Sequence, residues 1–331
     1  MSPTEVQPLP TASAAAQLDG APDRDGVGAS PAPLVSVVMT VYNTAPYLAE
    51  ALDSVLNQTF NDFEFVIIDD GSTDRCPEIL AEYAARHPRI RYVSRPHRGI
   101  VGAANEGIEL ARGRYVARMD SDDISVPHRL VTQVAYMEAH PDCVLLGSRV
   151  MLMDPYGSPV VESGHKLTHE EIDRELLTAE GGWALVHPST MIRLDALRSV
   201  GGYRGWANTS EDHDLYLRLA EVGRVANLDE VLLWYRRHYK SVTHTQYSQQ
   251  LAVKEGIIRE AYARRGKSMP TGWKFEGWSP PPMAQQLRLW GWAALKAKNR
   301  RVARLHAVGA VRRAPFSIDA WRLMYCALRG Y

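Results

Sequence analysis

Short runs of β-branched and aliphatic residues alternate with helical patterns over residues 34–153, and this rhythm constrains the fold more than any other feature. The run at residues 35–42 (VSVVMTVY) is almost wholly apolar, as buried parallel strands are. Alternation of strands and helices predicts an α/β domain, with a mostly parallel, Rossmann-like sheet flanked by helices. Further runs of this kind occupy residues 63–68, 90–93, 115–119 and 144–152.

Three of the expected strands end in polar side chains. Thr40, Asp69 and Asp120 stand at or just beyond the ends of the first, second and fourth strands. Ligands of open α/β sheets bind beyond the carboxyl ends of the strands. We therefore expect these residues to converge on one site.

Composition divides the chain into three parts. Residues 1–33 are rich in Ala, Pro, Ser and Gly without apolar periodicity, which predicts a disordered tail. Residues 34–247 form the expected α/β domain, in which the strand–helix rhythm is regular over residues 34–153 and loosens into a loop-rich region over residues 154–247. Residues 248–331 are expected to form a helical, basic C-terminal extension.

Charge and cysteine content narrow the class of protein. Lys and Arg number 38 and so do Asp and Glu, and the resulting zero net charge argues against a nucleic-acid binder. The 3 cysteines lie far apart and show neither a disulfide framework nor metal-ligand spacing. With no apolar run of about 18 residues, these features predict a cytoplasmic protein.

The C-terminal segment from Arg288 onward carries many Lys and Arg residues, interleaved with Trp, Phe and Tyr. One interpretation is peripheral contact with an anionic membrane on its cytosolic face, since each such cation contributes about 1 kcal/mol near anionic lipid. The alternative is a solvated basic face on a helical subdomain. No nucleic-acid-binding motif accompanies the charge.

The sequence Asp120-Ser121-Asp122-Asp123 follows a predicted buried strand. Clustered carboxylates repel one another unless cations neutralise them, and oxygen ligands favour a hard ion such as Mg²⁺ or Mn²⁺. The sequence therefore predicts a metal site able to hold a diphosphate. The alternative is an ordinary solvated turn.

Two further acidic motifs have a functional and a structural interpretation. An aspartate in Asp69-Asp70-Gly71 could accept a hydrogen bond from a nucleobase, or the segment could be only a turn before a helix. Glu211 and Asp212 stand at a predicted helix start, where the helix dipole should keep a general base ionised. Thr209-x-x-Asp212 also matches a capping box.

Taken together, the motifs resemble glycosyltransferase family 2. They are VSVVMTVYN (35–43), NQT (57–59), DDGSTD (69–74), Asn105-x-Gly107, DSDD (120–123), HPSTMI (187–192), Glu211-Asp212 and YRRH (235–238). The resemblance covers roughly residues 34–240, and it implies that residues 34–247 are a catalytic domain with a nucleotide- and metal-binding half at 34–153 and an acceptor half at 154–247. It implies a GT-A fold and an inverting transfer of one sugar from a nucleoside-diphosphate sugar, expected to be UDP-linked, to a glycan or lipid-linked hydroxyl.

The resemblance also implies roles for individual residues. Asp212 matches the general base, and Glu211 its neighbour that orients the acceptor. Asp122 and Asp120 match the metal-binding Asp-x-Asp, and His238 stands where some relatives contact the metal or phosphate; a buried structural histidine is the alternative. Residues expected to contact the nucleotide are Thr40, Val41, Tyr42, Asn43, Asp69, Asp70, Asn105, Arg118, Asp120 and Ser121.

The sequence departs from the family pattern at one basic position. Many relatives have an arginine before the asparagine that corresponds to Asn105, where this chain has Ala104. Arg98 or Arg118 could serve the diphosphate instead, although Arg118 could equally be a charge partner of the acidic cluster. Gln285-x-x-Arg288 only superficially matches the motif of processive synthases, which favours single-sugar addition.

Two rival functions are considered. A nucleotidyltransferase on a similar scaffold would need a Gly-rich basic loop near the first strand, and residues 40–46 are not one. A catalytically inactive binding protein with the same fold is disfavoured because the metal, base-binding and general-base carboxylates are all present.

Overall fold

The computed structural model describes the chain over residues 32–178, 183–238, 247–270 and 281–330. Residues 1–31, which make up nearly all of the expected tail, lie outside the described residues. Among the described helices, none is both long and apolar enough to cross a lipid bilayer.

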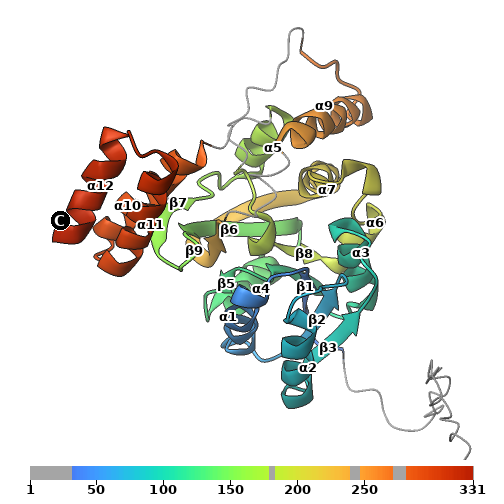
Figure 1. The fold of residues 1–331 in the computed structure, drawn as a ribbon. Coiled ribbons are helices and arrows are strands. Elements are labelled where there is room, and N and C mark those ends of the chain that lie inside the picture. Colours follow the sequence, from blue (N-terminus) through green and yellow to red (C-terminus); the bar gives the residue numbers. More distant parts are fainter. Residues whose placement is uncertain (1–31, 179–182, 239–246, 271–280, 331) are drawn as a thin grey trace, which may run out of the picture. The chain divides into compact units, whose positions relative to one another are not determined.

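The alternation predicted for the first half of the domain is confirmed (Figure 1). The five predicted strands of this half are each within one or two residues of their predicted bounds, and the two-residue strand β5 was not predicted. The elements are β1 (Val35–Val41), α1 (Ala45–Leu56), β2 (Phe63–Asp69), α2 (Cys76–Arg86), β3 (Ile90–Ser94), α3 (Ile100–Leu110), β4 (Tyr115–Asp120), β5 (Ile124–Ser125), α4 (Arg129–Ala139) and β6 (Cys143–Met153).

The second half, predicted to be rich in loops, contains more helices and strands than its sequence pattern indicated. Its elements are β7 (Pro159–Ser163), α5 (His169–Thr178), η1 (His187–Ser189), β8 (Met191–Arg193), α6 (Leu194–Ser199), η2 (Gly205–Ala207), α7 (Glu211–Leu219) and β9 (Arg224–Arg236). The predicted helical end of the chain consists of α9 (Tyr247–Arg264), α10 (Met283–Lys296), α11 (Arg300–Arg313) and α12 (Ile318–Arg329).

In the described residues, nine strands form a single sheet in the order β3-β2-β1-β4-β8-β6-β9-β5, with β7 beside β6. The strands from β3 to β4 are parallel, as predicted. Beyond β4 the sheet is mixed, because β8 runs antiparallel to both β4 and β6, whereas β9 runs parallel to β6. The short β8 has only three residues, too few for its direction to be read from a hydrophobic pattern.

Apolar side chains on the two faces of the sheet form two cores. On β1, Val37 and Met39 join the core beneath α1, α2 and α4, whereas Val38 points to the other core. That second core contains residues of α3, α5, α6, α7 and α9. Figure 1 shows α5, α7 and α9 on one side of the sheet and α1 and α4 on the other. The sheet is therefore buried between two helical layers.

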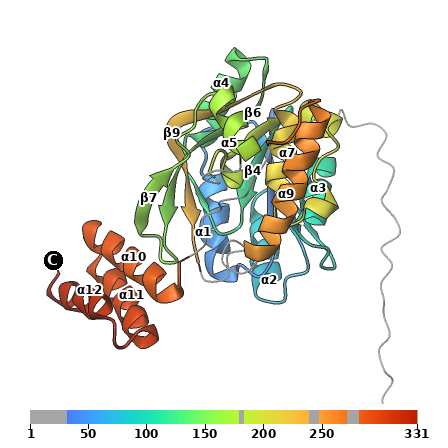
Figure 2. The ribbon, with the colours of Figure 1, turned by 90° about the horizontal axis from the view of Figure 1, so that it is seen from above.

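The expected boundary at residue 247 does not coincide with the packing. Ile257 and Ala261 of α9 are fully buried in the second core of the sheet, so α9 packs as part of the catalytic domain. The next helices, α10 to α12, pack on one another (Figure 2). Their buried side chains form two apolar clusters, one that includes Ala303 and one that includes Trp290.

A buried polar pair joins these C-terminal helices to the turn between β6 and β7. His306 of α11 is 2.7 Å from Asp154 between Nε2 and Oδ2, and both side chains are almost completely buried. The other carboxylate oxygen of Asp154 accepts hydrogen bonds from the backbone N–H groups of Tyr156 and Ser158. Removing the imidazole would leave a buried carboxylate oxygen without this partner.

We predict that His306→Leu lowers the free energy of unfolding by about 2 kcal/mol, or roughly 4 °C in melting temperature. The reason is the unpaired oxygen of Asp154, which lies out of reach of water. The exposed His165, whose ring faces only the Glu162 carbonyl, offers a matched His→Leu control. Equal melting temperatures for His306→Leu and the wild type in thermal denaturation would show that this pair does not stabilise the fold.

Candidate functional site

The register of the central strands brings the predicted site residues to one edge of the sheet. Thr40 pairs with Asp120 across β1 and β4, and the next residue, Val41, pairs with Asp69 across β1 and β2. Because these strands are parallel, all three polar residues stand at their carboxyl ends. The convergence expected from the sequence is confirmed at the level of the backbone.

The acidic cluster consists of Asp120, Asp122 and Asp123, each with one carboxylate oxygen within 4.8 Å of the others. Asp120 lies 2.9 Å from the Arg118 guanidinium, and Asp122 lies 2.9 Å from Nε2 of His238. Asp123 accepts a hydrogen bond from the backbone N–H of Arg236. His238 thus contacts the cluster through Asp122, and the backbone of Arg236 contacts it through Asp123. The roles of Asp120, Asp122 and His238 at a metal ion stay predictions.

The nearby positive charges do not fully offset the burial and mutual repulsion of these carboxylates, because the pKa values of Asp120 and Asp123 are raised. Burial, together with the charges of Asp122 and Asp212, raises the pKa of Asp120 to about 6 although Arg118 opposes the shift. Burial and the other two carboxylates also raise the pKa of Asp123. One oxygen of Asp123, Oδ2, is buried and has no hydrogen-bond partner in the part of the chain that the structure describes. An oxygen-only donor set with an unpartnered carboxylate oxygen fits a hard divalent cation such as Mn²⁺ or Mg²⁺.

Arg118 is buried, and its two terminal guanidinium nitrogens are engaged inside the protein, whereas its Nε has no hydrogen-bond partner among the described residues. It donates hydrogen bonds to Thr40 Oγ1 and to the carbonyls of Val38 and Met119, besides its ion pair with Asp120. These contacts correspond to the charge-partner alternative. Contact of Arg118 with a diphosphate stays a prediction.

The segment after β1 offers one exposed aromatic ring. Tyr42 stacks on His97, with ring centroids 4.3 Å apart and planes inclined by 22°. Val41 is buried in the core, and Asn43, at a φ of 54°, uses its side-chain oxygen to accept the N–H groups of Thr73 and Asp74. Of this segment, Tyr42 is therefore the side chain best exposed for contact with a nucleotide.

Asp69 and Asp70 are both buried and both hold loops. Asp69 accepts hydrogen bonds from the backbone N–H of Ser72 and from the Ser94 hydroxyl. Asp70 accepts the backbone N–H groups of Arg98 and Gly99 and lies 2.8 Å from Nδ1 of His97. The turn interpretation is thus satisfied, and contact of either carboxylate with a base stays a prediction.

Two other predicted nucleotide residues also make internal hydrogen bonds. The side-chain amide of Asn105 pairs with both the N–H and the carbonyl of Tyr203, at 2.9 Å each. The Ser121 hydroxyl accepts a hydrogen bond from Thr44 at 2.8 Å. Asn105 therefore positions the loop before α7, and contact of either residue with a nucleotide stays a prediction.

The start of α7 presents Glu211 and Asp212. Ser210 is the N-cap without a side-chain capping hydrogen bond, and the Thr209 hydroxyl has no partner among the described residues. The capping box is therefore absent. Asp212 accepts the N–H of His213 at 2.8 Å, and its charge raises the pKa of Asp120, so the helix start and the acidic cluster belong to one site.

At this helix start, the pKa values of Glu211 and Asp212 are raised, although the helix dipole favours their ionised forms. Burial and the neighbouring Asp212 charge raise the pKa of Glu211 to about 7, and Oε2 of Glu211 has no hydrogen-bond partner among the described residues. Ionisation of Asp212 as a general base stays a prediction. Burial also raises the pKa of Asp212, although Lys254 and the His213 N–H act in the opposite direction. Desolvation outweighs the helix terminus here.

His97, Arg236 and Lys254 also lie at this site, and none of them was predicted from the sequence as a site residue. His97 stands in the loop after β3, which pairs with β2, so its position beside Asp70 follows from strand order. Arg236 belongs to the YRRH segment, and its guanidinium also bonds the Asp122 carbonyl and Glu50. Lys254 lies on α9, a helix without any motif that would point to the site.

A pH-dependent stability follows from Glu211. Its native pKa of about 7 lies above its ordinary value of 4.5, so the folded protein holds a proton that the unfolded chain releases. The stability contribution of Glu211 therefore falls as pH rises from about 4.5 to 7. We predict that Glu211→Gln raises the melting temperature of metal-free protein at pH 8 by roughly 3 to 6 °C, with little change at pH 5.

Thermal denaturation at both pH values measures this effect. The matched control is Glu109→Gln, on the exposed face of α3. Indistinguishable melting temperatures of Glu211→Gln and wild type at pH 8 would show that Glu211 is ionised without cost in the native protein.

Comparison with known proteins agrees with this geometry. The family model described as "Glycosyl transferase family 2" matches residues 36–201. The O-antigen biosynthesis glycosyltransferase WbnJ of Escherichia coli is 35% identical over 214 residues, which cover 63% of this chain and 81% of WbnJ.

Solved structures share the fold. A fragment of S. aureus TarS in complex with UDP-GlcNAc gives a TM-score of 0.53 at 19% identity, covering 89% of this chain and 92% of the fragment. The mannosyltransferase PcManGT from Pyrobaculum calidifontis, in complex with GDP-Man and Mn²⁺, gives 0.51 at 21% identity, covering 91% and 81%. The predicted GT-A fold is confirmed, and the chain belongs to glycosyl transferase family 2 and is a glycosyltransferase.

Proposed function

We propose that the protein transfers a single sugar, with inversion, from a UDP-linked donor to an acceptor hydroxyl. The observation that carries this proposal is the electrostatic coupling between the acidic cluster after β4 and Asp212 at the start of α7. The acidic cluster would hold a cation that binds the diphosphate of the donor. Asp212 would lie beside the acceptor hydroxyl that attacks the donor sugar.

In this proposal Asp212 is the general base. It accepts the proton of the acceptor hydroxyl while the oxygen attacks the anomeric carbon from the side opposite the leaving nucleoside diphosphate. The hydrogen bond that the backbone N–H of His213 donates to Asp212 holds this carboxylate on the first turn of α7. Glu211, next to it, would orient the acceptor. No covalent glycosyl-enzyme is required, unlike in retaining hydrolases.

The acidic cluster would hold the cation. Asp122 is the main ligand, with Asp120 nearer the ribose, and His238 supports Asp122 through its 2.9 Å contact. A bound Mn²⁺ or Mg²⁺ supplies Lewis-acid stabilisation of the charge that develops on the leaving diphosphate. Asp123, anchored to the backbone of Arg236, has the unpartnered oxygen that such a cation would satisfy.

The donor is proposed from two observations. The structural neighbours bind UDP-GlcNAc in one case and GDP-Man in the other, which supports a nucleoside-diphosphate sugar. The exposed ring of Tyr42 beside Asp70 suits a planar base, and resemblance to the family favours uracil.

The acceptor is proposed to be a glycan or a lipid-linked precursor of a polysaccharide. WbnJ, which acts in O-antigen biosynthesis by its name, supports this class. A lipid-linked acceptor would bring the enzyme to the cytosolic face of a membrane, where the basic C-terminal helices would make a peripheral contact.

The proposed metal site can be tested by removing its main ligand. Asp122→Ala should abolish donor hydrolysis and weaken the thermal stabilisation that Mn²⁺ plus UDP confers, because the cluster loses its main ligand. The exposed Asp62, remote from the cluster, provides an Asp→Ala control that should behave as wild type. Undiminished turnover by chelator-treated wild-type protein would contradict metal dependence.

The role of Asp212 as the general base can be tested by a substitution that removes its ability to take up a proton. Asp212→Asn keeps the size and the N–H bond but cannot take a full proton, so transfer should fall by about 10² or more while UDP binding stays near normal. Asp195 accepts the N–H of Ala196 at the start of α6 in the same way, so Asp195→Asn is the matched control. Normal transfer by Asp212→Asn, with only a lower melting temperature, would assign Asp212 a purely structural role.

A further inference from the structure

The C-terminal helices α10 to α12 expose an unusual share of large apolar side chains. Of the 15 such side chains exposed in the described part of the chain, 9 belong to these helices and their connections. They are Leu289, Trp292, Leu305, Val308, Phe316, Ile318, Trp321, Tyr325 and Leu328. Phe316, in the turn before α12, is 99% exposed, and an aromatic ring in that state makes no contribution to the fold.

Helix α12 has two apolar faces. Its inner face buries Ala320, Leu323 and Ala327 against α10 and α11. A second stripe, at spacings of three and four residues, lies on the outside and faces no other described element. We call it the outer stripe of α12; it consists of Ile318, Trp321, Tyr325 and Leu328, each between 53% and 84% exposed. Packing within the chain does not account for a second apolar face.

Positive charge surrounds the outer stripe. Arg322 and Arg329 are exposed on its border, and the Arg329 guanidinium lies 4.9 Å from the centre of the Tyr325 ring. Between residues 283 and 330, Asp319 is the single acidic residue. The basic residues of this range are Arg288, Lys296, Lys298, Arg300, Arg301, Arg304, Arg312, Arg313, Arg322 and Arg329.

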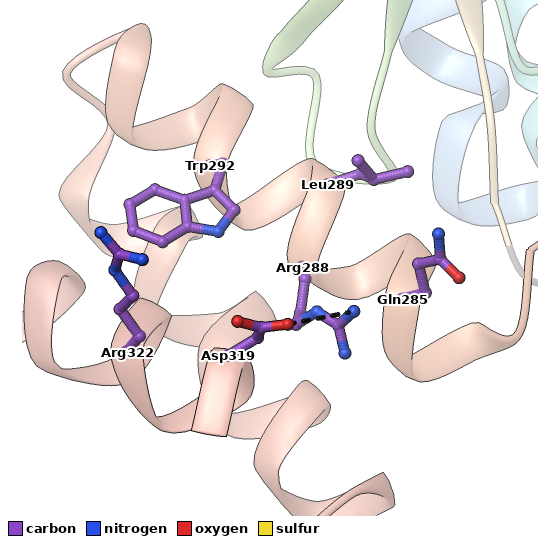
Figure 3. Close-up of a pocket in the computed structure, with 6 residues that line it drawn as sticks. All are labelled: Gln285, Arg288, Leu289, Trp292, Asp319 and Arg322. Atoms are coloured by element: carbon purple, nitrogen blue, oxygen red, sulfur yellow. Dashed lines mark ion pairs between the residues drawn. The ribbon is translucent and has the colours of Figure 1, made fainter. Parts of the chain in front are cut away.

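A pocket of about 400 Å³ lies between α10 and α12 beside this stripe (Figure 3). Its lining residues are Gln285, Arg288, Leu289 and Trp292 of α10 with Asp319 and Arg322 of α12. Two guanidinium groups and an indole ring line it, and its one carboxylate, Asp319, is 3.9 Å from Arg288. Arginine suits phosphate oxygens, and tryptophan prefers the boundary between apolar and aqueous phases.

We propose that Phe316, the outer stripe of α12 and this pocket form one docking surface for an anionic phospholipid bilayer. The apolar side chains enter the interface, Arg322 and Arg329 lie at the level of the headgroups, and the pocket takes a lipid phosphate. Exposed apolar rings bordered by arginines, with nearly no acidic residue, complement an anionic lipid surface and repel a basic protein surface. This inference names the surface for the membrane contact proposed above and rests on that proposal.

The test is co-sedimentation of the full chain with vesicles, in low and high salt. Wild-type protein should bind vesicles of equimolar phosphatidylglycerol and phosphatidylcholine but not vesicles of pure phosphatidylcholine. High salt should weaken the binding to the anionic vesicles. The double variant Arg322→Gln/Arg329→Gln should bind these vesicles at least about tenfold more weakly than the wild type. Phe316→Ala/Ile318→Ala, which removes only exposed side chains, should also lose binding.

Matched controls separate this surface from charge and apolarity in general. Lys296→Gln/Arg301→Gln removes the same charge from exposed positions outside the surface, and Leu305→Ala/Val308→Ala removes apolar side chains from the outer face of α11. Both controls should bind as wild type. If either control loses as much affinity as the α12 variants, the assignment to this surface is overturned although a membrane contact persists.

Other outcomes overturn the contact itself. Equal binding to both lipids, or to neither, excludes an electrostatic membrane surface. Self-association in sedimentation velocity that Phe316→Ala/Ile318→Ala abolishes, without vesicle binding, would assign the stripe to a second copy of the chain. Donor hydrolysis in lipid-free buffer tests the glycosyltransferase proposal separately, so loss of the membrane inference leaves that readout unchanged.

Discussion

Repulsion among carboxylates is the constraint on which the site depends. The parallel strands bring Asp120, Asp122 and Asp123 to one edge, and α7 brings Asp212 close enough for its charge to raise the pKa of Asp120. Arginines from three directions oppose this repulsion: Arg118 pairs with Asp120, Arg236 anchors Asp123, and the buried Arg129 bonds the Arg118 carbonyl. Their charges are already used within the protein, so a diphosphate donor requires further positive charge, which a divalent cation can provide.

Much of this arrangement could be predicted from the sequence. Unbroken apolar runs located the strands, and because parallel strands end at the same edge, the convergence of Thr40, Asp69 and Asp120 followed from spacing alone. Alternative roles could not be decided in this way. Whether Arg118 faces a ligand or Asp120 depends on side-chain packing, and its burial among Thr40 and two carbonyls is a tertiary property.

The raised pKa values of Glu211 and Asp212 could not be predicted from the sequence, for a physical reason. The helix start at Glu211 carries a local signal for a low pKa, but burial acts against ionisation and cannot be read from the residues nearby in sequence. Likewise α9 lacks a motif that would join it to the catalytic domain, yet Ile257 and Ala261 complete the core behind α7. The contacts of His306 and Asp154 join residues 152 positions apart, beyond any local pattern.

We propose that Asp212 and the acidic cluster act together in an inverting transfer. The most direct test is proton NMR of the sugar released when water replaces the acceptor, recorded before the free sugar equilibrates between its anomers. With an α-linked UDP-sugar and Mg²⁺, we expect the β anomer to appear first. First appearance of the α anomer would show retention and contradict a single displacement assisted by Asp212.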